Sequence, residues 1–514
     1  MVSGPSGRKR GFSVKQLDLL LIHPPAQKKI YQSLSADLSA IEPPVWAAMA
    51  AEFVRRRGFN VEILDAEALG LDSSETAAEA IRKAPRLVAI AVYGHNPSAS
   101  TQMMPAVRNT CAEIKKLNPE LPILLFGGHA ATLSERTLRE EPVDFVCAGE
   151  GPHTITGLLA AVRNSWKNLD QVPDLWYRED LNLRASNISA PLINPIAQEI
   201  PCAAWDLLPM ERYRAHNWHC FGELSRTPYA AIYTTLGCPY HCSFCCIQAP
   251  FRSGEKTSGY SPQTNSYRFW EPETVLSQID TLVQKYGVKN IKIADEMFVL
   301  NPKHVEMICD GLIQRNYGLN LWAYARVDTV REGMIKKLKR AGFNWLAFGI
   351  EAADADVRKD VQKTFSQKFI FETLSKVRTA GISVIANYIF GLPEDTLQTM
   401  QATLDLALEL NTEFANFYCT MPYPGSGLFE GAMANDSLPK SWAGYSQYAE
   451  EAMPMPTRYL SSAEVLSFRD KAFQAYFKNL AYLNMIAEKF GLATSAEIQK
   501  MLECNLTRTH AGKA

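Results

Sequence analysis

The sequence predicts an α/β fold with two successive arrays of parallel strands and a helical region at the end of the chain. Short continuous runs of Val, Ile and Leu alternate with helical stretches twice along the chain. Such runs are typical of parallel strands that are buried on both faces. A region rich in helix formers and aromatic residues follows from about residue 429. We therefore expect an N-terminal doubly wound (Rossmann-like) domain, a partial (β/α)6 barrel and a C-terminal helical region.

The first array is expected over residues 14–165, after a basic, Gly/Ser-rich flexible tail at 1–13. The helix predicted before the second strand ends in three arginines and Gly58, a common stop signal. In a doubly wound sheet the ligand binds beyond the carboxyl ends of the strands. The five apolar runs that predict these strands are 17–25, 59–67, 86–94, 122–130 and 144–151.

The second array is expected over residues 228–428, after a connector at 166–227 that lacks periodicity and is expected to hold at most one hairpin. Six strand–helix units are too few for a closed eight-stranded barrel, so an open partial barrel is predicted, with active residues at the strands' C-terminal ends. Residues 429–514 are expected to form a helical lid or bracing domain. The six apolar runs of the barrel are 229–237, 288–296, 320–327, 345–352, 383–391 and 413–422.

Composition excludes several classes of protein. The 514 residues include 53 Lys+Arg and 54 Asp+Glu, so the chain lacks the net positive charge of a typical nucleic-acid binder. No apolar stretch reaches the roughly 18 residues of a transmembrane helix. Eleven cysteines without a signal peptide do not indicate a disulfide framework. We expect a cytoplasmic protein with neither a nucleic-acid partner nor a membrane span, whose cysteines have another role.

The first barrel strand leads directly into GCPYHCSFCC, which places Cys238, Cys242 and Cys245 in a C-x3-C-x2-C pattern. Three thiolates can converge on one metal centre, whereas a four-cysteine zinc or iron–sulfur site needs a fourth ligand. Cys246 is a poor fourth ligand, because its neighbour Cys245 points elsewhere. A four-iron cluster with three protein ligands keeps one iron open for a substrate. The alternative is a zinc site completed by His241.

This triplet, with Gly237 before it and Phe244 inside it, resembles the signature of the radical S-adenosylmethionine superfamily. The resemblance implies a 4Fe-4S cluster on Cys238, Cys242 and Cys245 whose open iron binds the amino and carboxylate groups of S-adenosyl-L-methionine. It also implies an electron donor such as flavodoxin or ferredoxin. The electron that reaches the cluster then cleaves the sulfonium to a 5′-deoxyadenosyl radical.

Four later strand ends carry residues that resemble cofactor contacts of the same superfamily. Asp295 and Glu296 stand where a carboxylate meets the methionine amino group, and Arg326 is a candidate partner for the methionine carboxylate. Glu351 resembles a polar cofactor contact, and Gly391 lies in a turn like the one that contacts adenine. The alternatives are structural: Asp295 and Glu351 as helix N-caps, and Arg326 in an ion pair.

A doubly wound domain before such a barrel resembles the cobalamin-binding class of radical enzymes, which includes class B methyltransferases and anaerobic cyclases. The resemblance implies a cobalamin site at small and polar residues beyond the strands: Tyr93, Gly94, Gly127, Gly128, Gly149, Glu150 and Gly151. The sequence has no D-x-H-x-x-G motif, and prolines follow His23 directly. We therefore expect cobalamin without a histidine on cobalt. The loop histidines His95 and His129 are more simply explained as hydrogen-bonded side chains, and a degenerate domain without cofactor is the alternative.

The expected function is methylation of an unactivated carbon of a small molecule or natural-product intermediate. Other enzymes of the class that this sequence resembles catalyse cyclisation, dehydration or rearrangement, and these reactions stay open as alternatives. A non-catalytic corrinoid- or metal-binding sensor is the alternative from a different class. Cleavage of S-adenosylmethionine distinguishes the sensor from any of the enzymes.

Overall fold

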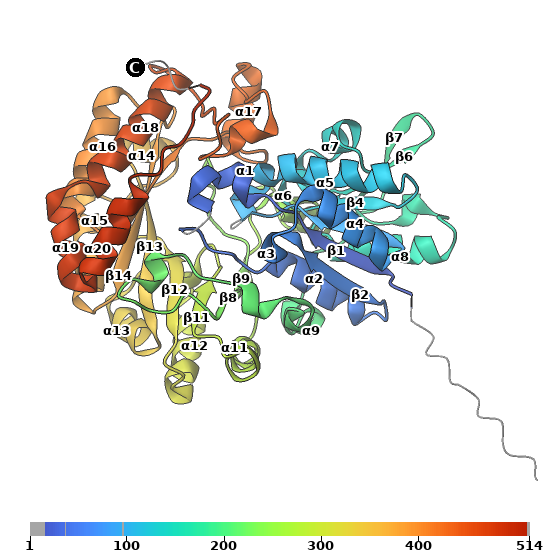
Figure 1. The fold of residues 1–514 in the computed structure, drawn as a ribbon, viewed down its shortest axis with the longest axis horizontal. Helices are drawn as coiled ribbons and strands as arrows, with labels where there is room; N and C mark the ends of the chain where they lie inside the picture. The colour runs from blue at the N-terminus through green and yellow to red at the C-terminus, as the bar shows by residue number, and fades with distance from the viewer. Residues whose placement is uncertain (1–15, 36–37, 95–96, 511–514) are drawn as a thin grey trace, which may run out of the picture.

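The computed structural model describes residues 16–35, 38–94 and 97–510. The tail predicted at 1–13 lies outside the described residues. In this part of the chain two sheets lie side by side, each with its own helices (Figure 1). Their strand orders are β2-β1-β3-β4-β5-β6-β7 and β15-β14-β13-β12-β11-β8. The predicted succession of a doubly wound domain, an open barrel and C-terminal helices is confirmed.

The parallel strands of the first sheet are buried on both faces, which explains why they appear in the sequence as continuous apolar runs. In β1 the side chains of Leu19 and Leu21 enter the core on one face of the sheet, and those of Leu20 and Ile22 enter the core on the other. Each residue of such a strand is therefore buried. The parallel strands are β1 (Leu19–His23), β2 (Val61–Asp65), β3 (Leu87–Ala91), β4 (Ile123–Phe126) and β5 (Phe145–Cys147).

Helices cover both faces of this sheet. The longer ones are α2 (Val45–Arg55), α4 (Ser73–Lys83), α5 (Met104–Leu117), α7 (Ser134–Glu140) and α8 (Pro152–Arg163). The turn after α2 reaches Gly58, which has a φ of 83°, a left-handed conformation that glycine adopts without strain. Short helices lie near the strand ends: α1 (Gln27–Tyr31), α3 (Ala66–Leu69) and α6 (Gly128–Thr132).

The connector contributes more to the first sheet than its sequence indicates. Its hairpin, β6 (Leu175–Glu179) and β7 (Asn182–Ala185), pairs antiparallel with β5 and extends the sheet. Leu175 and Tyr177 are buried, whereas Arg178 and Glu179 are exposed. A strand that is only partly buried lacks the continuous apolar run by which the other strands are predicted. After the hairpin the connector holds α9 (Ile196–Glu199) and irregular segments up to the barrel.

The barrel sheet is parallel throughout and open between its first and last strands. Its strands are β8 (Tyr229–Ile232), β11 (Asn290–Ile293), β12 (Asn320–Ala325), β13 (Phe343–Glu351), β14 (Ser383–Phe390) and β15 (Phe414–Cys419). Its helices are α11 (Pro272–Tyr286), α12 (Pro302–Arg315), α13 (Glu332–Arg340), α14 (Ala355–Asp360), α15 (Gln367–Thr379) and α16 (Leu397–Leu410). Between β8 and α11 lie β9 (Thr235–Leu236), α10 (Arg252–Thr257) and β10 (Arg268–Phe269).

The C-terminal region braces both domains. Its helices are α17 (Gly427–Ala434), α18 (Ser462–Phe477), α19 (Leu480–Phe490) and α20 (Leu492–Met501), and the last three lie along the outer side of the barrel (Figure 1). A largely irregular segment between α17 and α18 reaches the first domain instead. There the Trp442 indole N–H donates to Glu141 at 3.2 Å, and its ring meets His129 edge-on at 4.6 Å between centroids.

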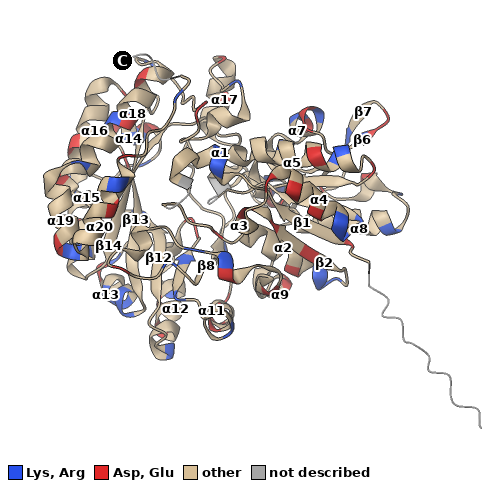
Figure 2. Ribbon diagram, in the orientation of Figure 1, with Lys and Arg blue, Asp and Glu red and all other residues tan. Residues whose placement is uncertain are grey.

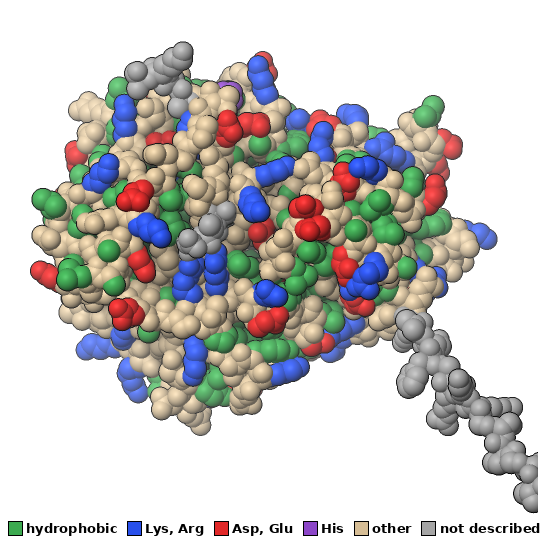
Figure 3. Space-filling view, in the orientation of Figure 1, with side chains coloured by type: hydrophobic (Ala, Val, Ile, Leu, Met, Phe, Trp, Pro, Cys, Tyr) green, Lys and Arg blue, Asp and Glu red, His purple; other side chains and the backbone are tan. Residues whose placement is uncertain are grey.

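Charged side chains of both signs are interspersed along the helices (Figure 2) and over the face shown in Figure 3. That face therefore carries no large field of a single sign. In the part of the chain that the structure describes, every helix is too short or too polar to cross a bilayer.

Two buried ion pairs join the first domain to the barrel. Glu150, which follows β5, accepts from Arg268 of β10 at 2.8 Å, with side chains 8% and 4% exposed. Glu42, which precedes α2, accepts from Lys292 of β11 at 2.9 Å. Charged groups removed from water are stable only when they are paired and hydrogen-bonded.

The replacement Glu150→Ala leaves the Arg268 guanidinium buried without its partner. We expect it to lower the free energy of unfolding by about 3–5 kcal/mol, the usual cost of removing one member of a buried pair. Chemical denaturation followed by circular dichroism measures this. The matched control is Glu135→Ala, which removes an exposed partner of Arg139 and should change stability by about 0.5 kcal/mol or less. Equal effects of both variants would contradict the assignment.

Candidate functional site

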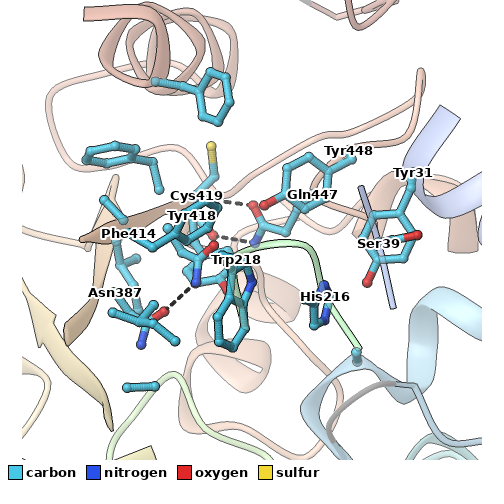
Figure 4. A pocket seen from close by; sticks show the side chains of 18 of the residues that line it. Tyr31, Ser39, His216, Trp218, Asn387, Phe414, Tyr418, Cys419, Gln447 and Tyr448 are labelled. Atoms are coloured by element: carbon cyan, nitrogen blue, oxygen red, sulfur yellow. Dashed lines mark hydrogen bonds between the residues drawn. The ribbon is translucent and has the colours of Figure 1, made fainter. Parts of the chain in front are cut away.

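A cavity of about 410 Å³ lies where the mouth of the barrel meets the first domain. The inner faces of the barrel strands form one wall, for example Trp322 and Tyr324 of β12. Tyr31 and Gln102 of the first domain form the opposite wall. The connector supplies His216 and Trp218, and the C-terminal segment supplies Gln447 and Tyr448 (Figure 4). The cavity therefore takes its walls from every major part of the chain.

The cysteine loop follows β9 at the edge of this cavity. Gly237, which opens the loop, has a φ of 87°, and a Cβ there would lie 2.2 Å from the Ser266 carbonyl oxygen, so the tight turn requires glycine. Within the loop, Phe244 lines the cavity. Cys238, Cys242 and Cys245 are partly exposed and form no disulfide. The loop thus presents three free thiols beside the cavity.

The environment of these thiols suits a cluster better than a single ion. Burial raises the pKa of Cys238 to about 12 and that of Cys245 well above its ordinary value, so the thiolates need a strong positive charge beside them. Among the described residues, no three His, Cys, Asp or Glu side chains converge on a position for one metal ion. This geometry weighs against zinc with His241. In a four-iron cluster each thiolate binds a different iron and the three need not converge.

Arg326 lies beside the cysteine loop rather than in the lining of the cavity. Its Nη1 lies 3.8 Å from Cys242 Sγ, and its guanidinium carbon lies 4.0 Å from the centre of the Tyr240 ring. Asp328 accepts from its Nε and Nη2, both at 3.0 Å. The ion pair that was the structural alternative is present, and it fixes a positive charge at the edge of the proposed cluster site.

Asp295 and Glu296 are neighbours with different surroundings. Asp295 is fully buried and accepts from the Thr234 backbone N–H at 2.6 Å and from the Thr234 hydroxyl. Its carboxylate therefore fastens the segment that follows β8, and the cofactor contact expected for it stays a prediction. Glu296 lines the cavity, and burial raises its pKa to about 8 against the opposing effect of Lys292. Its Oε1 is buried without a hydrogen-bond partner in the described structure. An orphaned carboxyl oxygen at this position fits a ligand that carries an ammonium group.

Glu351 also lines the cavity, and its backbone is strained. It has a φ of 66°, and the pairing of β13 with β14 shifts register between Gly349 and Glu351. Its carboxylate accepts from Lys363, and the side chains of this pair are each 6% exposed. A Cβ on Gly349 would lie 2.4 Å from Glu351 Oε1, so this glycine makes room for the pair. Strain of this kind persists where the surroundings impose it, commonly at functional sites.

Gly391 shapes a turn and does not line the cavity. It has a φ of 78°, and a Cβ there would lie 2.5 Å from a methyl group of Val465 in α18. Asp395 accepts from the backbone N–H groups of Gly391 and Leu392, both at 3.0 Å. The adenine contact expected of this turn stays a prediction.

Two of the residues expected to contact cobalamin lie between the domains. Tyr93 and Gly94 line a small cavity of about 40 Å³ together with His23, Trp46 and Tyr233. Tyr93 stacks on Trp46 with 4.5 Å between ring centroids, and its hydroxyl is buried without a partner in the described structure. An unpartnered hydroxyl beside the glycine fits a ligand rich in amide groups, such as cobalamin.

The other residues expected at that site have partners within the protein. Glu150 forms the interdomain ion pair with Arg268 and accepts from the Ile193 N–H at 2.8 Å, so its carboxylate is already used. A Cβ built on Gly127 would lie 2.3 Å from Val92 O, and one on Gly149 would lie 2.6 Å from Asp174 Oδ2. A Cβ on Gly151 would lie 2.6 Å from Phe126 Cδ2. Gly128 is buried at the start of α6. These glycines make close contacts within the protein, and the cobalamin contacts expected of them stay predictions.

The histidines near this edge are engaged. His23 Nδ1 lies 2.9 Å from Asp65 Oδ1. Although burial acts to lower it, the Asp65 carboxylate raises the pKa of His23 above its ordinary value. His129 Nδ1 contacts the Thr101 hydroxyl at 3.1 Å, and burial lowers the pKa of His129 to about 3. His95 lies outside the described residues.

Several cavity residues were missed from the sequence. They lie in segments without periodicity: His216, Asn217 and Trp218 in the connector, and Gln447 and Tyr448 before α18. Gln447 accepts from the Cys419 N–H at 2.9 Å and donates to its carbonyl oxygen at 2.7 Å (Figure 4). The only indication in the sequence was the density of aromatic residues and histidines around 213–221.

Models of two protein families match this chain. Residues 232–407 match the model of the radical SAM superfamily, and residues 32–159 match that of the B12 binding domain. An uncharacterized methyltransferase of Pyrococcus horikoshii is 27% identical over 492 residues, which cover 95% of this chain and 99% of that protein. The anaerobic magnesium-protoporphyrin IX monomethyl ester cyclase of Rubrivivax gelatinosus is 26% identical over 422 residues, covering 80% of this chain and 69% of that protein.

Two solved structures share the architecture. The radical S-adenosylmethionine methyltransferase TsrM from Kitasatospora setae, with cobalamin and a [4Fe-4S] cluster bound, aligns with a TM-score of 0.64 at 16% identity over 90% of both chains. The cobalamin-dependent S-adenosylmethionine radical enzyme OxsB aligns with a TM-score of 0.66 at 15% identity over 95% of this chain and 71% of that one. At these identities the likeness concerns the fold.

The replacement Glu296→Gln tests the orphaned carboxylate. We expect the affinity for S-adenosylmethionine to fall about ten- to a hundredfold, because a charge-assisted hydrogen bond contributes roughly 1.5–3 kcal/mol. Iron content after anaerobic reconstitution should not change. Equilibrium dialysis with labelled S-adenosylmethionine measures the affinity. The control is Glu273→Gln on α11, where the side chain is 80% exposed. Unchanged affinity in Glu296→Gln would assign this carboxylate a structural role.

A second prediction concerns His23. Pro24 and Pro25 follow His23 directly and fix the backbone of the loop that would have to reach under a corrin ring to bring this imidazole to cobalt. We therefore expect electron paramagnetic resonance of protein-bound cob(II)alamin to show no splitting from an axial nitrogen. Triplet splitting that disappears in His23→Ala would refute this, and failure to bind any corrinoid would favour the degenerate-domain alternative.

Proposed function

Because this chain belongs to the radical S-adenosylmethionine enzymes that carry a B12-binding domain, we propose that it transfers a methyl group to an unactivated carbon of a small molecule. The observation that carries the proposal is the position of the cavity. It lies between the cysteine loop, represented by Phe244, and the first domain, represented by Tyr31 and Gln102. A carbon atom held there can be reached from both cofactor sides.

The proposal gives each group of residues a task. Cys238, Cys242 and Cys245 would hold the cluster, and Glu296 would hold the methionine amino group of S-adenosylmethionine. Arg326 and Glu351 would contact the rest of that cofactor, while Tyr93 and Gly94 would contact cobalamin. When bound, the cluster and S-adenosylmethionine would supply hydrogen abstraction from carbon, and cobalamin would supply a methyl donor. A small electron-transfer protein such as flavodoxin or ferredoxin would supply the electron.

The walls of the cavity would protect this chemistry. Trp218, Trp322 and Phe414 line the cavity and are each less than 8% exposed. Such side chains keep water away from reactive species and hold a substrate in one orientation. Hydrogen bonds between residues that line the cavity restrict the motion of its walls further. The Gln447 side chain, for example, makes two hydrogen bonds with the backbone of Cys419.

The test uses protein reconstituted anaerobically with iron, sulfide and cobalamin, together with dithionite as the electron donor and S-adenosylmethionine whose methyl group is deuterated. Incubated with an extract of small molecules, the enzyme should yield a product that carries the deuterated methyl group, detected by mass spectrometry, together with 5′-deoxyadenosine. Formation of 5′-deoxyadenosine without a labelled product would favour cyclisation, dehydration or rearrangement. The related protein of P. horikoshii is named a methyltransferase, which favours the first outcome.

The controls separate the cluster from the remaining cysteines. Replacing Cys238, Cys242 and Cys245 together by Ala should remove the iron–sulfur absorption and all cleavage of S-adenosylmethionine, because thiolates hold such clusters. Cys246→Ala, a neighbouring buried thiol, should leave both unchanged. A triple variant that still holds four irons per chain would refute the ligand assignment.

A further inference from the structure

We propose that the substrate is an uncharged, flat, aromatic molecule that accepts hydrogen bonds. The inference rests on the methyl transfer proposed above and concerns the part of the cavity away from the cysteine loop. Its aromatic lining comes from four separate parts of the chain: Tyr31, Trp218, Trp322, Tyr324, Phe414, Tyr418 and Tyr448.

The arrangement of the rings favours a flat ligand. Trp218 meets Trp322 edge-on, with 5.1 Å between centroids, and Trp322 meets Tyr324 edge-on at 5.0 Å. Trp218 also stacks on His216 at 5.4 Å. Aromatic faces and edges attract other π-systems in offset-stacked and edge-to-face geometries. The cavity volume of about 410 Å³ lies within the usual range for small-molecule sites.

The charges around the cavity argue against an anionic substrate. Of the described residues that line it, Lys292 is the one side chain with a permanent positive charge. Its Nζ donates to both carboxylate oxygens of Glu42, at 3.1 and 2.9 Å. A phosphate or carboxylate group bound here would be buried with no cation available to pair with it, which is costly.

The neutral polar groups point to hydrogen-bond acceptors on the substrate. The Trp322 indole N–H and the Asn217 amide nitrogen are buried and have no partner in the described structure. Both residues line the cavity, and both groups can only donate. By contrast, the Asn416 amide already donates to Asn387 Oδ1 at 2.9 Å. Since buried donors in folded proteins nearly always have a partner, two orphaned donors at one cavity mark where a ligand's carbonyl or ring nitrogen would lie.

The experiment compares three probes of one ring skeleton on anaerobically reconstituted protein loaded with S-adenosylmethionine. Isoquinolin-1(2H)-one is flat, neutral and carries a carbonyl acceptor. Decahydroisoquinolin-1-one keeps the carbonyl and loses the aromatic rings, and isoquinoline-1-carboxylate keeps the rings and adds a negative charge. Isothermal titration calorimetry should show that the first probe binds more tightly than the other two.

Trp322→Phe keeps an aromatic ring and removes the indole N–H. It should weaken binding of isoquinolin-1(2H)-one about three- to tenfold, the effect of one neutral hydrogen bond. The control is Trp345→Phe, at the register partner of Trp322 on β13, which is equally buried and does not line the cavity. Melting temperature and iron content confirm that both variants are folded.

Tighter binding of the saturated or the anionic probe, or no binding of the aromatic lactam up to its solubility limit, would overturn the inference. Equal affinity in Trp322→Phe and wild type would overturn the assignment of the indole donor. Formation of 5′-deoxyadenosine is measured in parallel samples of the same protein to which dithionite is added as a one-electron reductant. Its presence with a failed probe comparison refutes the substrate class alone, and its absence refutes the proposed function independently of the probes.

Discussion

The buried ion pair between Glu42 and Lys292 joins the first domain to the interior of the barrel, and the site depends on it. Lys292 lies on the inner face of β11, where a charge without a partner would destabilise the barrel. The partner comes from the first domain, and the Tyr229 hydroxyl of β8 donates to the same carboxylate at 3.2 Å. The barrel interior is therefore electrostatically complete only when the first domain is docked. A two-domain cavity follows directly from this requirement.

The distribution of polar groups extends the same reasoning to the rest of the site. Charges that serve the architecture are paired within the chain, as in Glu150 with Arg268, Glu351 with Lys363 and Arg326 with Asp328. Four groups without partners in the described structure belong to residues that line the two cavities between the domains: Glu296 Oε1, Trp322 Nε1, the Asn217 amide nitrogen and the Tyr93 hydroxyl. Because a cavity can place a ligand beside them, these four are the candidates for ligand contacts, whereas the paired charges serve the architecture.

The sequence predicted those parts of the molecule that local patterns determine. The strands were predictable because both faces of each sheet are covered, as in β3, where Leu87–Ala91 is buried throughout. The cysteine loop was predictable from its spacing. The hairpin β6–β7 was only suspected within the connector, because its outer residues are exposed and interrupt the apolar run.

The roles of single polar residues depended on contacts that no local pattern contains. Glu150 looked like a ligand contact after a strand, but its partner Arg268 is 118 positions away. Asp295 and Glu296 are adjacent and chemically similar, yet Thr234 engages the first and leaves the second facing the cavity. The aromatic cavity residues of the connector were missed for the same reason, since only the docked domains bring Trp218 against Trp322.

The residues proposed to hold the cofactors and part of the residues proposed to bind the substrate come from different segments of the chain. The residues assigned to the cluster and S-adenosylmethionine lie in the loop after β9 or at the ends of barrel strands, where the sheet positions their backbone. Three of the seven aromatic residues proposed to meet the substrate, Tyr31, Trp218 and Tyr448, lie in α1, the connector and the segment before α18. These segments are irregular or short, so their side chains can change with less effect on the strand register than changes within the barrel. A fold built in this way can keep one reaction while its substrates differ, because this part of the substrate wall and the cofactor site belong to different stretches of the chain.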